Sequence, residues 1–326
     1  MSAASLTTKP LVSLIVPVFN EQESIPVFID AVVRERQQWG FDTEIIFVDD
    51  GSSDQSLQQL RQAAEQHEFI QYVSFSRNFG KEIALSAGLD HAQGDAAVML
   101  DVDLQHPLAT IPEFVAKWQS EGYDMVYGLR NLDNQETWLK RATSRVFYKL
   151  FNVMAHSSLP EGGGDFRLLD RKVVDALCAM PERNRFMKGL YAWVGFKSVG
   201  IRYEQPAREL GESKFNYWKL WNFALDGLVS FSTWPLRMWS YVGGVVALLA
   251  FVYASVIVIK TLIYGVDVPG YASLVTGILF LGGMQLLSIG VIGEYLGRLF
   301  VETKSRPLYV VAEKHTRSEP EADRDS

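Results

Sequence analysis

Apolar runs alternate with amphipathic segments along residues 11–130. Five runs predict strands, and they read VSLIVPVF, TEIIFVDD, IQYVSFSR, AAVMLDVD and DMVYGLR. The stretches between them predict helices over residues 23–39, 54–67, 80–92 and 110–121. Strands that alternate with helices are typical of an α/β fold with a mostly parallel sheet. In such a sheet, ligands bind outside the carboxyl ends of the strands.

The alternation weakens after residue 130. Residues 131–213 contain a predicted turn at Gly162-Gly163-Gly164, a predicted helix from Arg171 to Met180 and a predicted strand around Phe196 to Tyr203. Residues 213–235 then space Phe, Trp and Leu with rough helical periodicity. An aromatic-rich amphipathic helix of this kind is typical of a membrane interface, and an ordinary domain helix is the alternative.

Two long uncharged segments follow. Neither Met238–Ile259 nor Val268–Gly293 contains a charged residue, and each exceeds the roughly 20 residues that a helix needs to cross about 30 Å of hydrocarbon. They predict a transmembrane hairpin with spans of about 238–260 and 269–293. Because no charge lies within a span, we expect a membrane anchor rather than a transport path. Its glycines are a candidate contact in a homo-oligomer: Gly243, Gly244, Gly282 and Gly283.

Basic residues flank the two spans. Arg237 precedes the first, and Arg298, Lys304 and Arg306 follow the second. By the positive-inside rule, we expect the large N-terminal domain and both termini on the cytoplasmic side of the inner (plasma) membrane. The polar tail after residue 312 lacks apolar periodicity, so we expect it to be disordered. The chain thus divides into a flexible N-terminus (1–10), an α/β catalytic domain (11–212), an interfacial helix region (213–235), the hairpin (236–300) and a cytoplasmic tail (301–326).

Composition argues against three features: general nucleic-acid binding, an internal disulfide and an N-terminal signal peptide. The net charge of −7 argues against general affinity for nucleic acid, which needs a concentrated basic surface. The single cysteine, Cys178, cannot form an internal disulfide and fits a small core position in a helix. The first ten residues contain no apolar stretch of signal-peptide length.

The sequence Asp101-Val102-Asp103-Leu104-Gln105 ends the predicted strand AAVML. Its two carboxylates and its amide carbonyl are hard oxygen ligands, the type that Mg²⁺ and Mn²⁺ prefer. A divalent cation held there would neutralise a diphosphate as it leaves.

Other strand ends also carry polar residues. Asp49 and Asp50 close the second strand, where one acid is a candidate to bind a base or a ribose, and turn formation is the alternative. Phe19 and Glu21 follow the first strand and are candidates to stack on and hydrogen-bond a nucleobase. Arg208 and Lys214, in ARELGESKFN, are candidate phosphate partners, with a solvated loop as the alternative.

Six motifs occur in a fixed order along the chain: VPVFNE, VDDGSSD, NFGKEIALSAG, DVDLQHP, GGGDFRLLDR and RELGESKF. Together they resemble the polyprenyl-phosphate glycosyltransferases of the dolichyl-phosphate-mannose synthase type, within the family 2 glycosyltransferases. The likeness covers about residues 11–235. The two-span segment that ends in GEYLGR is similar to the bacterial members of the undecaprenyl-phosphate glucosyltransferase type.

The resemblance implies a GT-A fold and a set of site residues. It places the nucleotide at Pro17, Phe19, Glu21, Val48, Asp50 and Val102. It places the metal, Mg²⁺ or Mn²⁺, at Asp101, Asp103 and Gln105, and the phosphates near Arg130, Arg208 and Lys214. Relatives often have Tyr at position 19 and Ala at position 102, so Phe19 keeps a stacking surface but lacks a hydroxyl.

The resemblance also implies an inverting enzyme that moves a sugar from a nucleotide sugar to a polyisoprenyl phosphate. Asp165 is the candidate that faces the acceptor, as a base or as an orienting group, and loop capping is the alternative. Asp103 is the second catalytic candidate. UDP-glucose and undecaprenyl phosphate are the expected substrates, which would supply a lipid-linked sugar for cell-envelope glycan or O-antigen modification.

Several alternatives remain open from the sequence. UDP-linked aminoarabinose or GDP-mannose could replace UDP-glucose as the donor. A processive polysaccharide synthase is disfavoured because the sequence has neither a QxxRW-like element nor additional spans. A two-span transporter or scaffold with a degenerate nucleotide domain is the alternative outside enzymes.

Overall fold

The computed structural model describes residues 9–130, 163–180, 182–183, 185–204, 234–265 and 270–316. The chain divides into two compact units. The sheet unit comprises Met1–Leu220 and Arg306–Ser326, and the hairpin unit comprises Trp221–Ser305.

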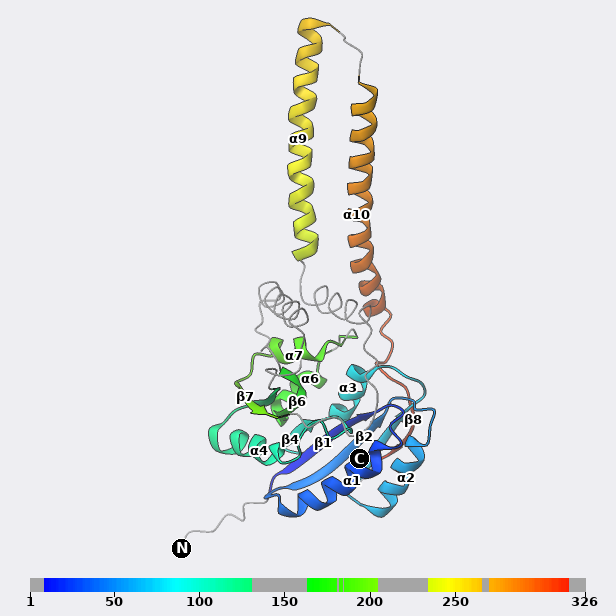
Figure 1. Cartoon of the computed structure of the whole chain (residues 1–326), viewed down its shortest axis with the longest axis vertical. Helices are drawn as coiled ribbons and strands as arrows, with labels where there is room; N and C mark the ends of the chain where they lie inside the picture. Colours follow the sequence, from blue (N-terminus) through cyan, green and yellow to red (C-terminus); the bar gives the residue numbers. More distant parts are fainter. Residues whose placement is uncertain are drawn as a thin grey trace, which may run out of the picture. The chain divides into compact units, whose positions relative to one another are not determined.

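An eight-stranded sheet forms the centre of the sheet unit (Figure 1). Its strands, in the order β7-β5-β6-β4-β1-β2-β3-β8, are Ser198–Tyr203, Met125–Arg130, Gly163–Asp170, Ala96–Met99, Leu11–Val18, Asp42–Asp49, Ile70–Phe75 and Val311–His315. β1 pairs in parallel with β2 and β4, and β2 pairs in parallel with β3. β5 pairs in parallel with β7, whereas β6 runs antiparallel between β4 and β5, and β8 runs antiparallel to β3. Four of the seven strand pairs in the described part of the chain are therefore parallel, which confirms the predicted mostly parallel sheet.

Helices cover both faces of the sheet (Figure 1). On one face, α1 (Ser24–Glu35), α2 (Ser56–Gln66) and α4 (Thr110–Glu121) contribute to one continuous apolar core with alternate residues of the strands. On the other face lie α3 (Lys81–His91), α6 (Arg171–Cys178) and α7 (Met187–Trp193). A short 3₁₀ turn, η1 (Arg36–Gln38), follows α1. The four helices predicted before residue 130 and the helix predicted from Arg171 are therefore confirmed.

The predicted turn at Gly162-Gly163-Gly164 is wrong for its last two residues. Gly163 and Gly164 begin β6, and Gly163 pairs with Leu129 of β5 across an irregular register. Glycine favours turns in sequence analysis, but it also permits the close backbone approach that such an irregularity requires.

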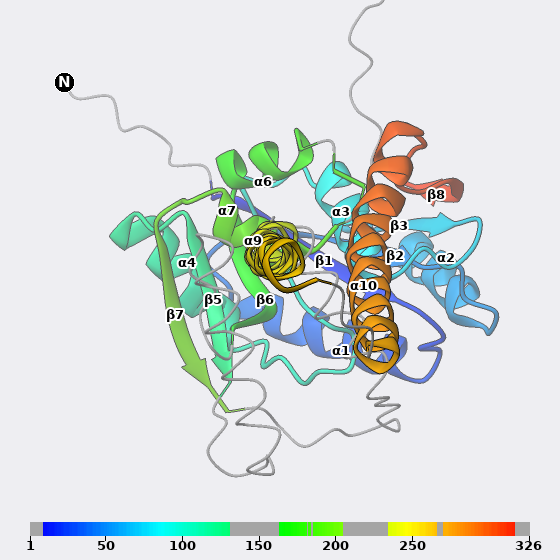
Figure 2. The same ribbon diagram turned by 90° about the horizontal axis from the view of Figure 1, so that it is seen from above.

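The prediction of disorder after residue 312 is wrong for Glu313–His315. These residues belong to β8, which pairs antiparallel with β3 (Figure 2). Glu313 binds Arg61 through two hydrogen bonds and accepts another from the Tyr72 hydroxyl at 2.6 Å. The strand is polar because it lies at the edge of the sheet, where side chains meet water and ion pairs replace an apolar pattern.

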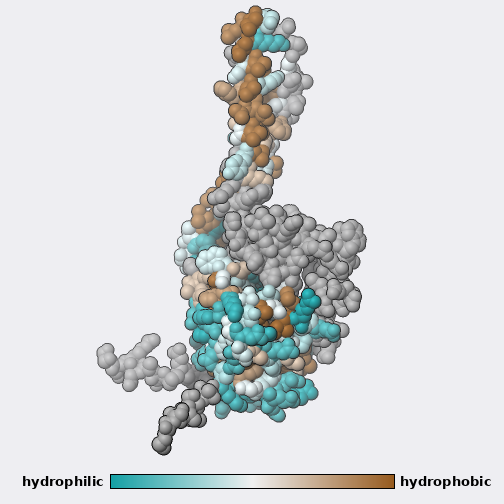
Figure 3. Space-filling model, turned by 90° about the vertical axis from the view of Figure 1, so that its left-hand side faces the viewer, coloured by the Kyte–Doolittle hydropathy of each residue, from teal (hydrophilic) through white to brown (hydrophobic). Residues whose placement is uncertain are grey.

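The hairpin unit contains two long helices, α9 (Trp234–Tyr264) and α10 (Tyr271–Thr303). Each has a 24-residue stretch long and apolar enough to cross a membrane, at Tyr241–Tyr264 and Phe280–Thr303. Large apolar side chains are exposed along both helices (Figure 3), for example Leu249 and Phe251 on α9 and Leu286 and Leu287 on α10. Exposed apolar surface of this extent is typical of a helix that contacts lipid.

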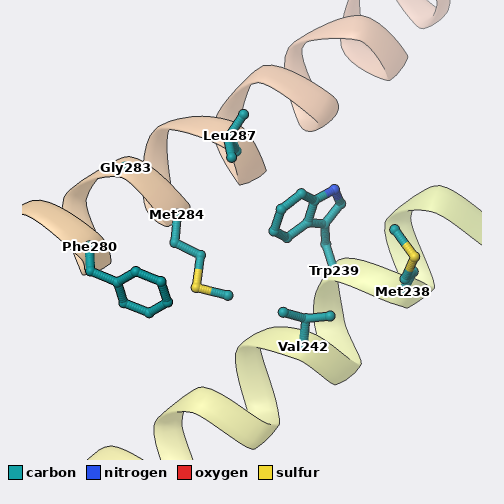
Figure 4. Close-up of a pocket in the computed structure, with 7 residues that line it drawn as sticks. All are labelled: Met238, Trp239, Val242, Phe280, Gly283, Met284 and Leu287. Atoms are coloured by element: carbon teal, nitrogen blue, oxygen red, sulfur yellow. The ribbon is translucent and has the colours of Figure 1, made fainter.

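Within the hairpin unit, α9 and α10 border an apolar cavity of about 410 Å³ (Figure 4). Its lining residues are Met238, Trp239, Val242, Phe280, Gly283, Met284 and Leu287. Gly283, which has no side chain to fill this space, is one of the glycines expected at an oligomer contact. That contact stays a prediction.

Gly88 provides a test of how α3 packs on the sheet. A Cβ atom at this position would lie 2.1 Å from Cγ2 of Ile15, a fully buried residue of β1. We expect Gly88→Ala to destabilise the protein by about 1–3 kcal/mol, because overpacking forces backbone or rotamer shifts. Thermal unfolding of the detergent-solubilised protein, followed by circular dichroism, should show a lower midpoint.

The matched control is Gly40→Ala, since a Cβ at Gly40 would meet nothing within 4 Å. Equal midpoints for the two variants would contradict the close packing of α3 on β1.

Candidate active site

The order of the strands determines where a ligand can bind. The chain proceeds from β1 to β2 and β3 on one side of β1, and then crosses through α3 to β4 on the other side. The loops after β1 and β4 therefore diverge at the carboxyl ends of these strands, which is where ligands bind in sheets of this type. Five of the residues predicted to bind substrate follow parallel strands of the sheet: Phe19 and Glu21 after β1, Asp50 after β2, and Asp101 and Asp103 after β4.

Hydrogen bonds join the loops after β1 and β2. Asn20 has a φ of 54°, a left-handed conformation that asparagine tolerates better than most residues. Its side-chain oxygen accepts a hydrogen bond from Ser53 N at 2.8 Å, and its own N–H donates to Ser52 Oγ at 2.9 Å. Glu21 N donates to Ser56 Oγ at 2.9 Å. Phe19 precedes this joined segment with 47% of its surface exposed, so its ring is available for stacking.

Asp50 lies at the end of β2 and is buried. Its carboxylate accepts hydrogen bonds from Phe79 N at 2.6 Å and from Gly80 N at 2.9 Å. Burial raises the pKa of Asp50, while these two N–H groups oppose the rise. The structure thus gives Asp50 a role in fixing the turn before α3, where Gly80 has a φ of 103°. Its predicted contact with the nucleotide, like those of Pro17, Val48 and Glu21, stays a prediction.

The loop after β4, which we call the acidic loop (Asp101–Gln105), is held from both ends. Asp101 N donates to His106 Nδ1 at 3.0 Å, and Gln105 N donates to Asp103 Oδ1 at 3.1 Å. Burial lowers the pKa of His106, which suits its role as a neutral acceptor. The His106 ring stacks on Phe166 of β6, with centroids 4.7 Å apart. Val102 is buried between the two aspartates, whose side chains are partly exposed.

The acidic loop contains a suitable but incomplete donor set for a divalent cation. It offers the carboxylates of Asp101 and Asp103 and the amide of Gln105, as expected for Mg²⁺ or Mn²⁺. Within the described residues, no group of three or more His, Cys, Asp and Glu side chains could hold a metal ion. With only these three side chains as protein ligands, an octahedral cation would keep its other coordination positions for phosphate oxygens and water.

Asp165 of β6 lies beside the acidic loop, and Lys81 connects the two. The Lys81 ammonium is 2.5 Å from Asp101 Oδ1 and 3.6 Å from Asp165 Oδ2. Partial loss of hydration lowers the pKa of Lys81, but these two carboxylates outweigh it and raise the pKa above its ordinary value. The second Asp165 oxygen, Oδ1, is buried and has no hydrogen-bond partner among the described residues. The geometry therefore places the predicted catalytic acid and the predicted metal ligands at one site.

Two further ionisable residues, Glu82 and Arg167, lie near Asp165. Glu82 Oε2 accepts a hydrogen bond from Met187 N at 2.9 Å, and burial together with the charge of Asp165 raises the pKa of Glu82. Arg167 is buried, and its guanidinium lies 3.7 Å from the centre of the Tyr191 ring. Lys81, Glu82, Arg167 and His106 were not among the predicted site residues, although all four lie within the motifs NFGKEIALSAG, DVDLQHP and GGGDFRLLDR. Lys81 and Glu82 also lie in the first turn of a helix predicted at a strand's carboxyl end.

The remaining predicted phosphate partners divide into two groups. Arg130 ends β5 and is exposed, and its charge lowers the pKa of Tyr203, which burial raises. Because β4 and β5 both run antiparallel to β6, the carboxyl end of β5 at Arg130 lies at the same edge of the sheet as the acidic loop. Arg208 and Lys214 lie outside the described residues, as does the predicted interfacial helix.

Comparison with known proteins defines the class. The model of glycosyl transferase family 2 matches residues 13–178, which include the acidic loop and Asp165. The chain is a glycosyltransferase with a GT-A-type α/β domain, and it belongs to family 2. A second family, described as the GtrB C-terminal hairpin, matches residues 234–299, which contain α9 and most of α10.

Relatives extend the match over nearly the whole chain. A prophage bactoprenol glucosyl transferase homolog of Escherichia coli K12 is 49% identical, over 92% of this chain and 98% of that protein. The SfII prophage-derived bactoprenol glucosyl transferase of Shigella flexneri is 48% identical, over 93% and 98%. Among solved structures, a mannosyltransferase from Pyrobaculum calidifontis in complex with GDP-Man and Mn²⁺ aligns with a TM-score of 0.48 and 20% identity, over 89% of this chain and 88% of that one.

Replacement of Asp103 tests the acidic loop as a metal site. We expect Asp103→Asn to weaken Mn²⁺ binding at least about tenfold, because one carboxylate charge is lost. The fold should be unchanged, since the asparagine oxygen can still accept the hydrogen bond from Gln105 N. Titration calorimetry of the purified protein with Mn²⁺ measures the affinity, and circular dichroism verifies the fold. Unchanged affinity in a folded variant would contradict the metal assignment.

Proposed function

We propose that this glycosyltransferase moves glucose from UDP-glucose to undecaprenyl phosphate on the cytoplasmic face of the membrane. The observation that carries the proposal is the meeting of Asp165 with the acidic loop at one site, in a chain that also contains two exposed apolar helices. The relatives named bactoprenol glucosyl transferases support the choice of glucose and of this lipid.

The proposed reaction is one displacement with inversion. A phosphate oxygen of the lipid attacks the anomeric carbon of glucose, the bond from that carbon to the diphosphate breaks, and UDP leaves with the electron pair. A divalent cation held by Asp101, Asp103 and Gln105 would supply positive charge to the leaving diphosphate. Arg130, at the same edge of the sheet, would add a further positive charge.

The acceptor needs little help to become a nucleophile. A phosphate monoester has a second pKa near 6, so it is mostly dianionic at neutral pH. Asp165 therefore serves better as a group that orients the acceptor or the sugar than as an indispensable base. Its buried Oδ1, which has no partner among the described residues, is the atom available for that contact.

Chain connectivity and the charges that flank the spans support the proposed membrane side. The hairpin unit is an insertion in the sheet unit, because the chain leaves after β7 and returns as β8. Two spans return the chain to the side from which it left. The sheet unit and both ends of the hairpin are then on one side, and Arg298, Lys304 and Arg306 favour the cytoplasmic side.

A transfer assay tests the proposal directly. Purified protein with Mg²⁺ and undecaprenyl phosphate should convert labelled UDP-glucose into a lipid-soluble monosaccharide product, and chelation of the metal should stop the reaction. Preferred use of UDP-linked aminoarabinose or GDP-mannose would replace the donor in the proposal. Products with several sugars would indicate a polysaccharide synthase, and failure to turn over any donor would favour a scaffold.

Asp165→Asn tests the role of Asp165 in the reaction. We expect kcat to fall by roughly 100-fold, the lower end of the range for lost acid or base function, while KM for the donor stays within about twofold. The reason is that an asparagine keeps the shape of the side chain but loses its charge, and the phosphate is already ionised.

Steady-state kinetics with both substrates measures these constants. The control is Asp42→Asn, which removes an exposed carboxylate at the opposite end of β2 and should leave kcat unchanged. A rise in donor KM without loss of kcat would instead assign Asp165 to nucleotide binding.

A further inference from the structure

Lys81 is held at the junction of two functional groups. Its ammonium is 2.5 Å from Asp101, a predicted metal ligand, and 3.6 Å from Asp165, the predicted catalytic acid. The two acids come from different strands, since Asp101 follows β4 and Asp165 belongs to β6. Lys81 belongs to neither strand, because it is the first residue of α3.

The position of Lys81 is unfavourable for its own helix. A helix N-terminus carries a partial positive charge, so a cation in the first turn opposes the helix dipole. The chain nevertheless fixes this residue firmly, because Asp50 binds the N–H groups of Phe79 and Gly80 immediately before it. The two ion pairs offset this unfavourable placement, which indicates that Lys81 serves the site rather than the helix.

The contact with Asp101 competes with metal binding. The ammonium directly contacts Asp101 Oδ1, and a divalent cation would need that carboxylate at about 2.0–2.2 Å. Both cations cannot occupy the same position on this oxygen. The Lys81 side chain is 44% exposed, so it has room to move, and Asp165 offers a second carboxylate close by.

Arg167 lacks this freedom. Its guanidinium is buried over the Tyr191 ring at 3.7 Å and donates a hydrogen bond to Gly164 O. Arg167 is thus a buried cation with a fixed position. Lys81, by contrast, has an exposed side chain that extends from the first turn of α3 to Asp101 and Asp165.

We propose that Lys81 is an exchangeable counter-ion that positions Asp165. In the ligand-free enzyme the ammonium neutralises Asp101 and Asp165 together. When a divalent cation takes Asp101, the ammonium shifts to Asp165 and holds that carboxylate toward the substrates. Metal binding and the orientation of Asp165 are in this way coupled through one side chain. The inference rests on the proposed metal site and on the proposed role of Asp165.

The test uses Lys81→Met and Lys81→Arg in the full-length protein. Calorimetric titration with Mn²⁺ alone, in the absence of substrates, measures competition for Asp101. We expect Lys81→Met to bind Mn²⁺ roughly tenfold more tightly than the native protein, because the competing charge has been removed. Lys81→Arg, which keeps the charge, should bind Mn²⁺ with near-native affinity.

Steady-state kinetics provides the second measurement. We expect Lys81→Met to lower kcat about tenfold or more with donor KM within twofold, since Asp165 loses its partner, and Lys81→Arg to recover part of that loss. The matched control is Lys117→Met, which removes an exposed lysine that pairs with Glu121 on α4 and should change neither measurement.

Different outcomes separate the inference from the proposed function. Equal or weaker Mn²⁺ binding by folded Lys81→Met overturns the competition, whatever sugar the enzyme transfers. Tighter Mn²⁺ binding with native kcat overturns the positioning of Asp165. Failure of the native protein to use UDP-glucose contradicts the proposed donor and leaves the Mn²⁺ measurement to decide on Lys81. Thermal unfolding confirms that each variant is folded, and Lys81→Gln replaces Lys81→Met if it is not.

Discussion

The carboxylate of Asp50 binds the two backbone N–H groups that precede α3, and the geometry of the site depends on this buried contact. Asp50 is also joined to β1, because its own N–H donates to Val18 O at 2.8 Å. The contact therefore fixes the start of α3 relative to β1 and β2, and it delivers Lys81 to the carboxyl edge of the sheet. From there Lys81 reaches Asp101 in the acidic loop and Asp165 on β6. The Asp50 contact thus links the end of β2 to the start of α3, and Lys81 links α3 to the two acids.

The site concentrates negative charge and partly neutralises it. Asp101 and Asp165 share the Lys81 ammonium, Asp103 belongs to the same loop as Asp101, and the charge of Asp165 contributes to the raised pKa of Glu82. Lys81 and Arg167 compensate for part of this charge. A diphosphate approaching the acidic loop would still meet like charge, which is the physical reason why a bound divalent cation suits this loop.

The hairpin unit is inserted between two strands of the sheet unit. The chain returns from α10 and ends its described part as β8, which covers the edge of β3. Tyr309 stacks on Phe75 and donates a hydrogen bond to Asp90, so the returning segment is fixed before β8 begins. An open sheet edge favours unwanted pairing with other chains. β8 covers the edge of β3 and leaves a short, charged strand outermost in the sheet, which discourages such pairing.

The sequence by itself determined the elements and the class of fold, because burial imposes apolar patterns that are local. The runs around Val16, Phe47 and Val98 predicted strands, and all three residues are buried in the core. The uncharged stretches predicted α9 and α10 for a different reason, since a helix that contacts lipid must be apolar over about 20 residues. The acidic loop was also visible, since two acids follow an apolar strand within three residues.

Only the tertiary structure decided how these parts act on one another. Lys81 and Asp165 are 84 positions apart, and Glu313 and Arg61 are 252 apart, so no local pattern could pair them. The polar strand β8 escaped prediction because an edge strand is stabilised by backbone pairing and ion pairs rather than by apolar burial. The turn before α3 depends in the same way on Asp50, 29 residues before Phe79. Such contacts arise from the order of the strands, and strand order becomes visible only when the sheet has formed.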